Sequence, residues 1–150
     1  MIKVEIKDGE IRRRLEGLLH RCGDLTPLMK NIGEALLRST DDRFRAESDP
    51  EGKPWRRLAP ATLKAKRRRG RDGLKILSDG GNLRGNIHYR AEKDRVSISS
   101  PEPYAAIHQF GGRTGRGHET TIPARPFFGV GPDDRREILA LTHDFLKEER

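Results

Sequence analysis

Residues 26–47 read TPLMKNIGEALLRSTDDRFRAE, the pattern of a long amphipathic helix. Thr26 is a candidate N-cap, and Pro27 falls in the first turn, where its missing N–H costs no hydrogen bond. Apolar side chains recur at multiples of four residues and so share one face of the helix: Leu28, Ile32, Leu36 and Phe44. We expect this helix to be the spine of the fold.

The segments on either side of this helix carry both helical and strand patterns. Residues 2–7 alternate apolar and polar side chains, which predicts a half-buried strand. A hairpin is predicted from strands at 87–91 and 95–99. Capping residues and apolar spacing predict further helices at 9–22, 60–69, 82–85 and 104–110, and from Asp133 onward. The sequence therefore predicts a single α+β domain over residues 1–150. Its long N-terminal helices pack on a small, mostly antiparallel sheet, and a C-terminal helix closes the chain.

Residues 111–129 are the hardest part of the chain to interpret. Residues 111–121 hold four glycines and almost no apolar side chain, which predicts an extended flexible loop. Residues 122–129 are apolar but interrupted by two prolines, which suits an edge strand or an extended arm. Two interpretations stay open: an arm that orders against a neighbouring subunit, or a strand packed on its own domain.

The composition limits the classes of protein that are compatible with this chain. Charged residues make up 36% and hydrophobic residues 33%, and the net charge of +8 favours an acidic partner. Cys22 is the single cysteine, which excludes an intrachain disulfide framework and a zinc cluster built on several thiolates. The longest uncharged stretch, ten residues at 103–112, is too short for a membrane span of about 20. We therefore expect a soluble, intracellular protein with no membrane partner.

A run of positive charge at 64–71 is the strongest charge signal. It contains six basic residues: Lys64, Lys66, Arg67, Arg68, Arg69 and Arg71. They either contact nucleic-acid phosphates without reading sequence, or form a solvated helix face or a contact for an acidic protein. No aromatic residue interleaves them, so base stacking is not indicated. The only tryptophan, Trp55, is expected to be a buried structural anchor rather than an exposed platform.

The sequence contains no arrangement of residues that indicates catalysis. Nucleophile-elbow, phosphate-loop and zinc-protease motifs are all missing. His108 and His118 are ten residues apart, with Glu119 beside the second, and this spacing disfavours a metal-dependent nuclease. We therefore expect no enzyme activity, no catalytic or metal-binding residue and no cofactor.

Four segments match a known pattern in the same order. Residues 44–58 place a phenylalanine before P-x-G-x-x-W-x-x-L, and residues 62–83 follow T-L…K…I-L-x-x-[TS]-G-x-L, with Gly80 where a hydroxyl residue is expected. Residues 104–111 match Y-A-x-[IV]-H-Q-F-G, and residues 122–129 match I-P-A-R-P-[FY]-[LF]-G. In this order the segments resemble the phage virion morphogenesis family, the tail-completion proteins of Mu-like and related contractile-tailed phages. We call residues 104–111 and 122–129 the first and second signature segments.

The resemblance implies a structural protein of virion assembly, acting at tail completion or head–tail joining. It would be found in the host bacterial cytoplasm during assembly and then in the virion, and its partners would be other tail or head–tail connector proteins. The alternative is a basic nucleic-acid-binding module without catalytic activity; the two roles are compatible.

Combined with the sequence patterns, the resemblance predicts a homo-oligomeric, ring-forming subunit. Its basic run would line a lumen and touch DNA without sequence specificity. Arg125 would pair with a carboxylate of a neighbouring subunit. The predicted subunit or partner interface comprises Tyr104, His108, Gln109, Phe110, Ile122, Pro123, Arg125, Pro126, Phe127 and Phe128.

Overall fold

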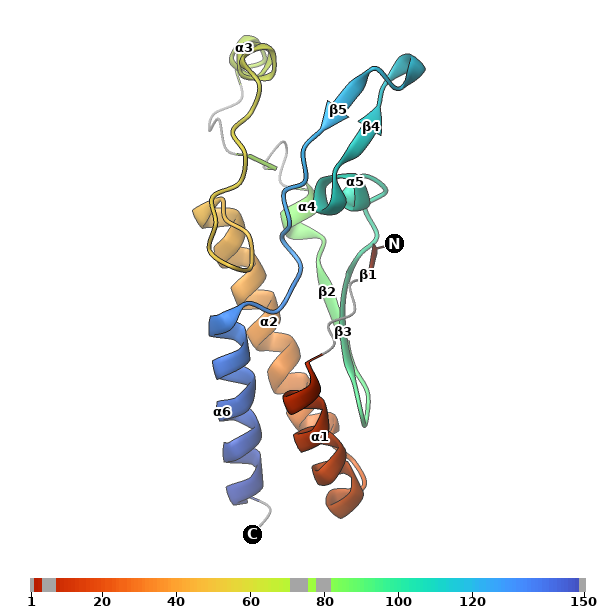
Figure 1. Cartoon of the computed structure of the whole chain (residues 1–150), viewed down its shortest axis with the longest axis vertical. Coiled ribbons are helices and arrows are strands. Elements are labelled where there is room, and N and C mark those ends of the chain that lie inside the picture. Colours follow the sequence, from red (N-terminus) through yellow and green to blue (C-terminus); the bar gives the residue numbers. More distant parts are fainter. Residues whose placement is uncertain (1, 4–7, 71–75, 78–81, 149–150) are drawn as a thin grey trace.

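The structure, a computed structural model, describes residues 2–3, 8–70, 76–77 and 82–148 (Figure 1). The elements in chain order are β1 (Ile2–Lys3), α1 (Gly9–Cys22), α2 (Thr26–Ala46), α3 (Pro60–Arg68), α4 (Asn82–Gly85), β2 (His88–Ala91), β3 (Val96–Ser100), α5 (Ala105–Phe110), β4 (Gly112–Thr114), a 3₁₀ turn (Arg116–His118), β5 (Thr120–Ile122) and α6 (Pro132–Glu148).

Long helices form one layer of the molecule and a small sheet forms the other. α2 packs against α6 and also against β2 and β3, while α1 packs against α6 (Figure 1). The sheet has the order β1-β3-β2 with antiparallel pairing, and Tyr89 lies opposite Ile98. The predicted α+β class, the N-terminal helices on an antiparallel sheet and the C-terminal helix are confirmed. Of the strand predicted at 2–7, residues 4–7 lie outside the described part of the chain.

Local sequence explains where the two N-terminal helices begin. The Asp8 carboxylate accepts hydrogen bonds from the backbone N–H groups of Glu10 and Ile11, both at 3.1 Å, and caps α1. The prediction that Thr26 caps α2 is wrong, because Thr26 is already in the first turn of that helix. Asp24 accepts from the Thr26 N–H at 2.8 Å and from its hydroxyl at 2.6 Å, and so it fixes the entry to the helix.

Two clusters of buried side chains divide the interior, and α2 contributes to both. The helical core joins the lower parts of α1, α2 and α6: Leu18, Leu25, Leu28, Met29, Ile32, Ile138 and Phe145. The second cluster, which we call the aromatic core, is formed by Phe44, Trp55, Ile76, Leu83, Ile98, Ala105, Phe127 and Phe128. α2 is therefore the spine that the sequence predicts, with its first half in one core and its end in the other.

Residues 111–121, predicted as a loop, form a β-hairpin. β4 pairs antiparallel with β5, so that Gly112 lies opposite Ile122 and Thr114 opposite Thr120. Threonine favours extended backbone, while Gly115 and Gly117 take the positive φ angles, 82° and 71°, that the turn requires. The hairpin projects from the body of the molecule (Figure 1).

Candidate functional site

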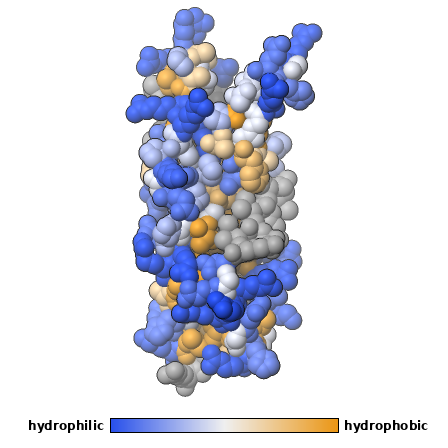
Figure 2. All heavy atoms as spheres, viewed as in Figure 1, coloured by the Kyte–Doolittle hydropathy of each residue, from blue (hydrophilic) through white to orange (hydrophobic). Residues whose placement is uncertain are grey.

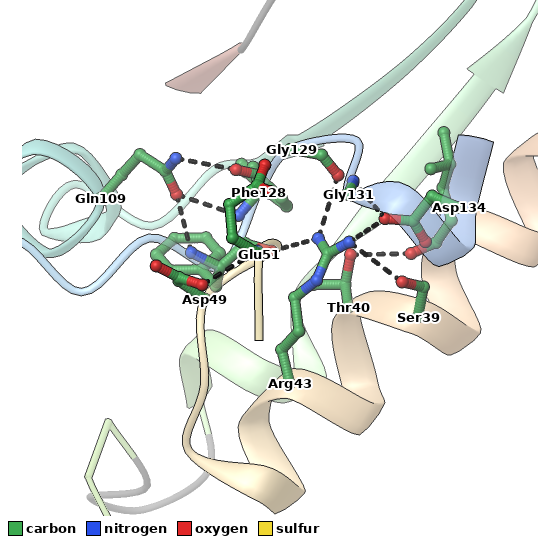
Figure 3. A network of polar contacts seen from close by, with 12 residues as sticks. Ser39, Thr40, Arg43, Asp49, Glu51, Gln109, Phe128, Gly129, Gly131 and Asp134 are labelled. Atoms are coloured by element: carbon green, nitrogen blue, oxygen red, sulfur yellow. Dashed lines mark hydrogen bonds and ion pairs between the residues drawn. The ribbon is translucent and has the colours of Figure 1, made fainter. Parts of the chain in front are cut away.

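The two signature segments meet, and Gln109 joins them. Its side-chain N–H donates to the Phe128 carbonyl at 2.9 Å, and its oxygen accepts from the N–H groups of Phe127 and Phe128, both at 3.0 Å (Figure 3). The Arg125 N–H donates to the His108 carbonyl at 2.7 Å. One buried amide therefore satisfies three backbone groups that would otherwise lose hydrogen bonds on burial.

Arg125, which the sequence predicts to pair with a neighbour's carboxylate, donates within its own chain to two backbone carbonyls. Its Nε donates to the Arg56 carbonyl at 2.7 Å and its Nη2 to the Arg57 carbonyl at 3.2 Å. Burial lowers the pKa of Arg125, and the nearby Arg56 lowers it further. Trp55 is buried beside it, and its indole N–H donates to the Pro126 carbonyl at 2.8 Å. The second signature segment is thus tied to the chain that precedes α3.

Arg43 anchors the other end of this segment from α2. Its Nη1 donates to the Phe127 carbonyl at 2.8 Å and to the Gly129 carbonyl at 3.0 Å, while its Nη2 pairs with Asp134 (Figure 3). Burial lowers the pKa of Arg43, and the Asp134 carboxylate opposes that shift. The sequence patterns did not predict this ion pair. The available signal was spacing, since Met29, Leu36 and Arg43 recur every seven residues on the apolar face of α2.

Four residues of the predicted interface lie in the interior of the chain. They are Gln109, Arg125, Phe127 and Phe128. The Phe127 ring packs 4.6 Å from Phe128 and 5.4 Å from Phe44, measured between centroids. In this conformation these side chains support the surface from beneath, so we do not retain them as contacts with a neighbour.

The exposed part of the predicted interface is smaller and lies around α5. Phe110 is 64% exposed and Tyr104 is 37% exposed, while Ile122, Pro123 and Pro126 are half-buried. His108 is half-buried, its Nδ1 has no hydrogen-bond partner, and the Tyr104 ring packs edge-on against it at 6.1 Å. Burial and the charge of Arg125 lower the pKa of His108. We define the outer rim as Tyr104, His108, Phe110, Ile122 and Pro123.

The predicted basic run is only partly exposed. Lys66 is buried, at 9% exposure, three residues along α3 from the half-buried Leu63, so it faces inward with that side chain. Arg71 lies outside the described residues. The exposed members are Lys64, Arg67, Arg68 and Arg69.

The described residues contain no group of three or more His, Cys, Asp or Glu side chains able to hold a metal ion. No described helix combines the length and the apolar character needed to cross a membrane.

The fold defines a small α+β protein with exposed features around α5, the hairpin and α3. The chain belongs to the phage virion morphogenesis family, whose sequence pattern matches residues 6–147. It is 34% identical over 148 residues to Mu-like prophage FluMu G protein 2 of Haemophilus influenzae. The aligned region covers 98% of this chain and 97% of that protein. It is 32% identical over 132 residues to the putative capsid assembly protein G of Escherichia phage Mu. This aligned region covers 85% of each chain. No solved structure matches the chain.

Family membership confirms the resemblance found in the sequence and gives the chain a structural role in phage virion assembly. The family is one of assembly proteins and is not known for enzymes. A role in assembly implies contact with other phage structural proteins, and such contacts require exposed surfaces.

Proposed function

We propose that the chain acts at tail completion or head–tail joining as a ring-forming subunit that contacts its neighbours through the outer rim and the β4–β5 hairpin. The observation that carries the proposal is the exposure of Phe110, a large aromatic side chain with 64% of its surface open to water. Aromatic residues of this kind are typical anchors at protein interfaces.

The buried network gives this rim a fixed shape. Gln109, next to Phe110 in the chain, is held by three hydrogen bonds to the second signature segment. A surface that is already ordered loses less conformational freedom on association. The hairpin begins directly after α5 and extends away from it (Figure 1), so its tip can reach a neighbour in a heterologous contact that repeats around a ring until it closes.

The first test measures the absolute mass of the purified protein by light scattering over a range of concentration and salt. We expect a discrete multiple of 17.0 kDa, and we expect Phe110→Asp to lower that mass without changing the unfolding midpoint. Phe110→Tyr is the matched control, because it keeps an aromatic ring on the rim. Each variant is also supplied in trans to a phage that lacks its own copy, and completed particles are counted, since assembly on a template does not require a free oligomer.

A wild-type monomer combined with full particle yield from Phe110→Asp would contradict the proposal. A defect in particles that retain heads and tails but fail to join them would support the assigned step.

The second test removes the hairpin. Because Gly112 and Ile122 pair directly, residues 113–121 can be replaced by a two-residue Asn-Gly turn that suits a short hairpin. We expect the fold to survive and particle completion to fail. If the shortened chain unfolds, the hairpin belongs to the core and its role as a contact surface is wrong.

A further inference from the structure

Positive charge is concentrated in two segments of the chain. Residues 53–70 contain eight lysines and arginines and no acidic residue, and residues 111–131 contain three arginines and one glutamate. Together the two segments carry ten net positive charges, two more than the whole chain, so the rest of the protein is net negative. The charge of +8 is therefore a property of one region rather than of the surface as a whole.

These two segments project from the same end of the molecule. α3 and the β4–β5 hairpin both extend beyond the aromatic core, at the end opposite the C-terminus (Figure 1). Figure 2 shows many hydrophilic side chains on both projections, with some hydrophobic ones among them on the α3 side. We define the basic end by its exposed cations: Lys64, Arg67, Arg68, Arg69, Arg113 and Arg116.

The cations of the basic end have no carboxylate partner among the residues that the structure describes. None of the described acidic side chains lies within ion-pair distance of the six residues that define it. Several exposed arginines elsewhere do pair with acids of their own helix, as Arg12 does with Glu16 at 2.9 Å and Arg14 with Glu10 at 3.1 Å. A cluster of uncompensated cations raises the local concentration of an anionic partner.

The chemistry of the basic end favours phosphate over an acidic protein. The large hydrophobic side chains exposed in the described part of the chain are Tyr104 and Phe110, and neither lies on α3 or the hairpin. A protein interface needs an apolar centre, whereas contacts to a phosphate backbone come from arginine, lysine, threonine and backbone N–H groups. Thr120 and Thr121 are exposed beside the hairpin arginines.

The same surface favours a duplex over a single strand. Proteins that hold single-stranded nucleic acid stack its bases on aromatic side chains, and α3 and the hairpin have none at 60–70 or 112–122. Two separate cationic projections can instead contact the phosphates of a double helix without reading its sequence.

We propose that the basic end binds the phosphate backbone of duplex DNA without sequence specificity, with α3 and the hairpin as two halves of one site. The binding is a property of the isolated chain, so it does not depend on ring formation. If the ring also forms, this end is the surface that faces DNA passing through it.

The test measures fluorescence anisotropy of two short DNA duplexes of unrelated sequence with the full chain, from about 50 to 200 mM KCl. We expect equal affinity for both duplexes and a steep fall with salt. One variant carries Arg67→Ala, Arg68→Ala and Arg69→Ala, and a second carries Arg113→Ala and Arg116→Ala. Loss of three phosphate contacts is expected to reduce the slope of log affinity against log salt by about 3, and loss of two by about 2.

The matched control removes the same charge elsewhere, through Arg12→Ala, Arg14→Ala and Arg136→Ala, three exposed arginines that pair with acids within their helices. We expect it to keep the wild-type slope. Equal weakening by the control would reduce the effect to net charge and overturn the proposal. So would no binding at low salt, tighter binding to a single strand, or equal competition by polyglutamate at matched charge. Light scattering on the same samples separates a failure of DNA binding from a failure to oligomerise.

Discussion

The helical body and the basic end use arginine in opposite ways. In the body, some arginines are held by carboxylates that come from other elements, as with Arg43 and Asp134 or Arg135 and Asp8. At the basic end, the exposed cations have no such partner among the described residues. A paired arginine fixes the position of a helix, whereas an unpaired one remains available to a partner. Our proposal assigns stability to the body and binding to the basic end, and the variants below test that division.

The largest effect is expected from the buried ion pair that links α2 to α6. Asp134→Ala leaves the Arg43 guanidinium buried without its carboxylate, and breaking such a pair costs about 3–5 kcal/mol. Glu137→Ala is the control, because its ion pair with Arg38 joins the same two helices at the exposed surface and is worth about 0–1 kcal/mol. Urea unfolding measures both. Equal losses would show that the burial of the pair is irrelevant to its contribution.

The second effect concerns the link between the signature segments. Gln109→Ala leaves three buried backbone groups without their partner, and we expect a loss of roughly 2–4 kcal/mol in the free energy of unfolding. Gln109→Glu is not expected to restore stability, because a carboxylate cannot donate to the Phe128 carbonyl. Phe110→Ala, one residue away and exposed, is expected to change stability by less than about 0.5 kcal/mol. A similar cost for both positions would contradict the division between interior and rim.

The helices and the hairpin of β2 and β3 could be predicted because their signals are local, whereas the short β4–β5 hairpin could not. The apolar spacing of α2, the Asp8 cap and the alternation in β2 and β3 each lie within one segment of the sequence. The pairing of residues 104–111 with 122–129 has no local signal, because Gln109 binds backbone atoms whose residue types do not matter. For the same reason, the sequence cannot separate interior from interface at Phe127, since an apolar side chain suits both.

The third prediction tests the contact between α2 and the sheet. Gly33 lies under the Tyr89 ring, and a β-carbon at this position would overlap that ring. Gly33→Ala should cost about 1–2 kcal/mol, as the ring moves and part of the loss is offset by the better helix propensity of alanine. Gly17→Ala on α1 meets nothing within 4 Å and should stabilise by up to about 1 kcal/mol. Thermal unfolding that ranks the two variants the other way would refute the packing of Tyr89 on α2.

The fourth prediction is a dependence of stability on pH through His108 at the outer rim. Burial, and next the charge of Arg125, lower its pKa in the folded chain below the usual 6.5. The unfolded chain therefore takes up a proton first as pH falls through 6.5, and the folded state loses stability until the pH passes the lowered pKa. His108→Gln should flatten this part of the profile, while His118→Gln removes an exposed imidazole as the control. Urea midpoints between pH 7.5 and pH 5 measure the difference, and an unchanged slope in His108→Gln would contradict the prediction.

The smallest change in stability is expected at the basic end. Replacing Arg67, Arg68 and Arg69 by alanine removes no ion pair with a described carboxylate, so the free energy of unfolding should change by less than about 0.5 kcal/mol. Relief of repulsion between neighbouring cations on one helix gives the change a stabilising direction. Arg135→Ala, in the body, removes the bridge from α6 to Asp8 and Glu10 and should destabilise the fold more, although it is a single substitution. If the triple variant is the less stable of the two, the cations of α3 support the fold, and the separation between a stabilising body and a binding end is wrong.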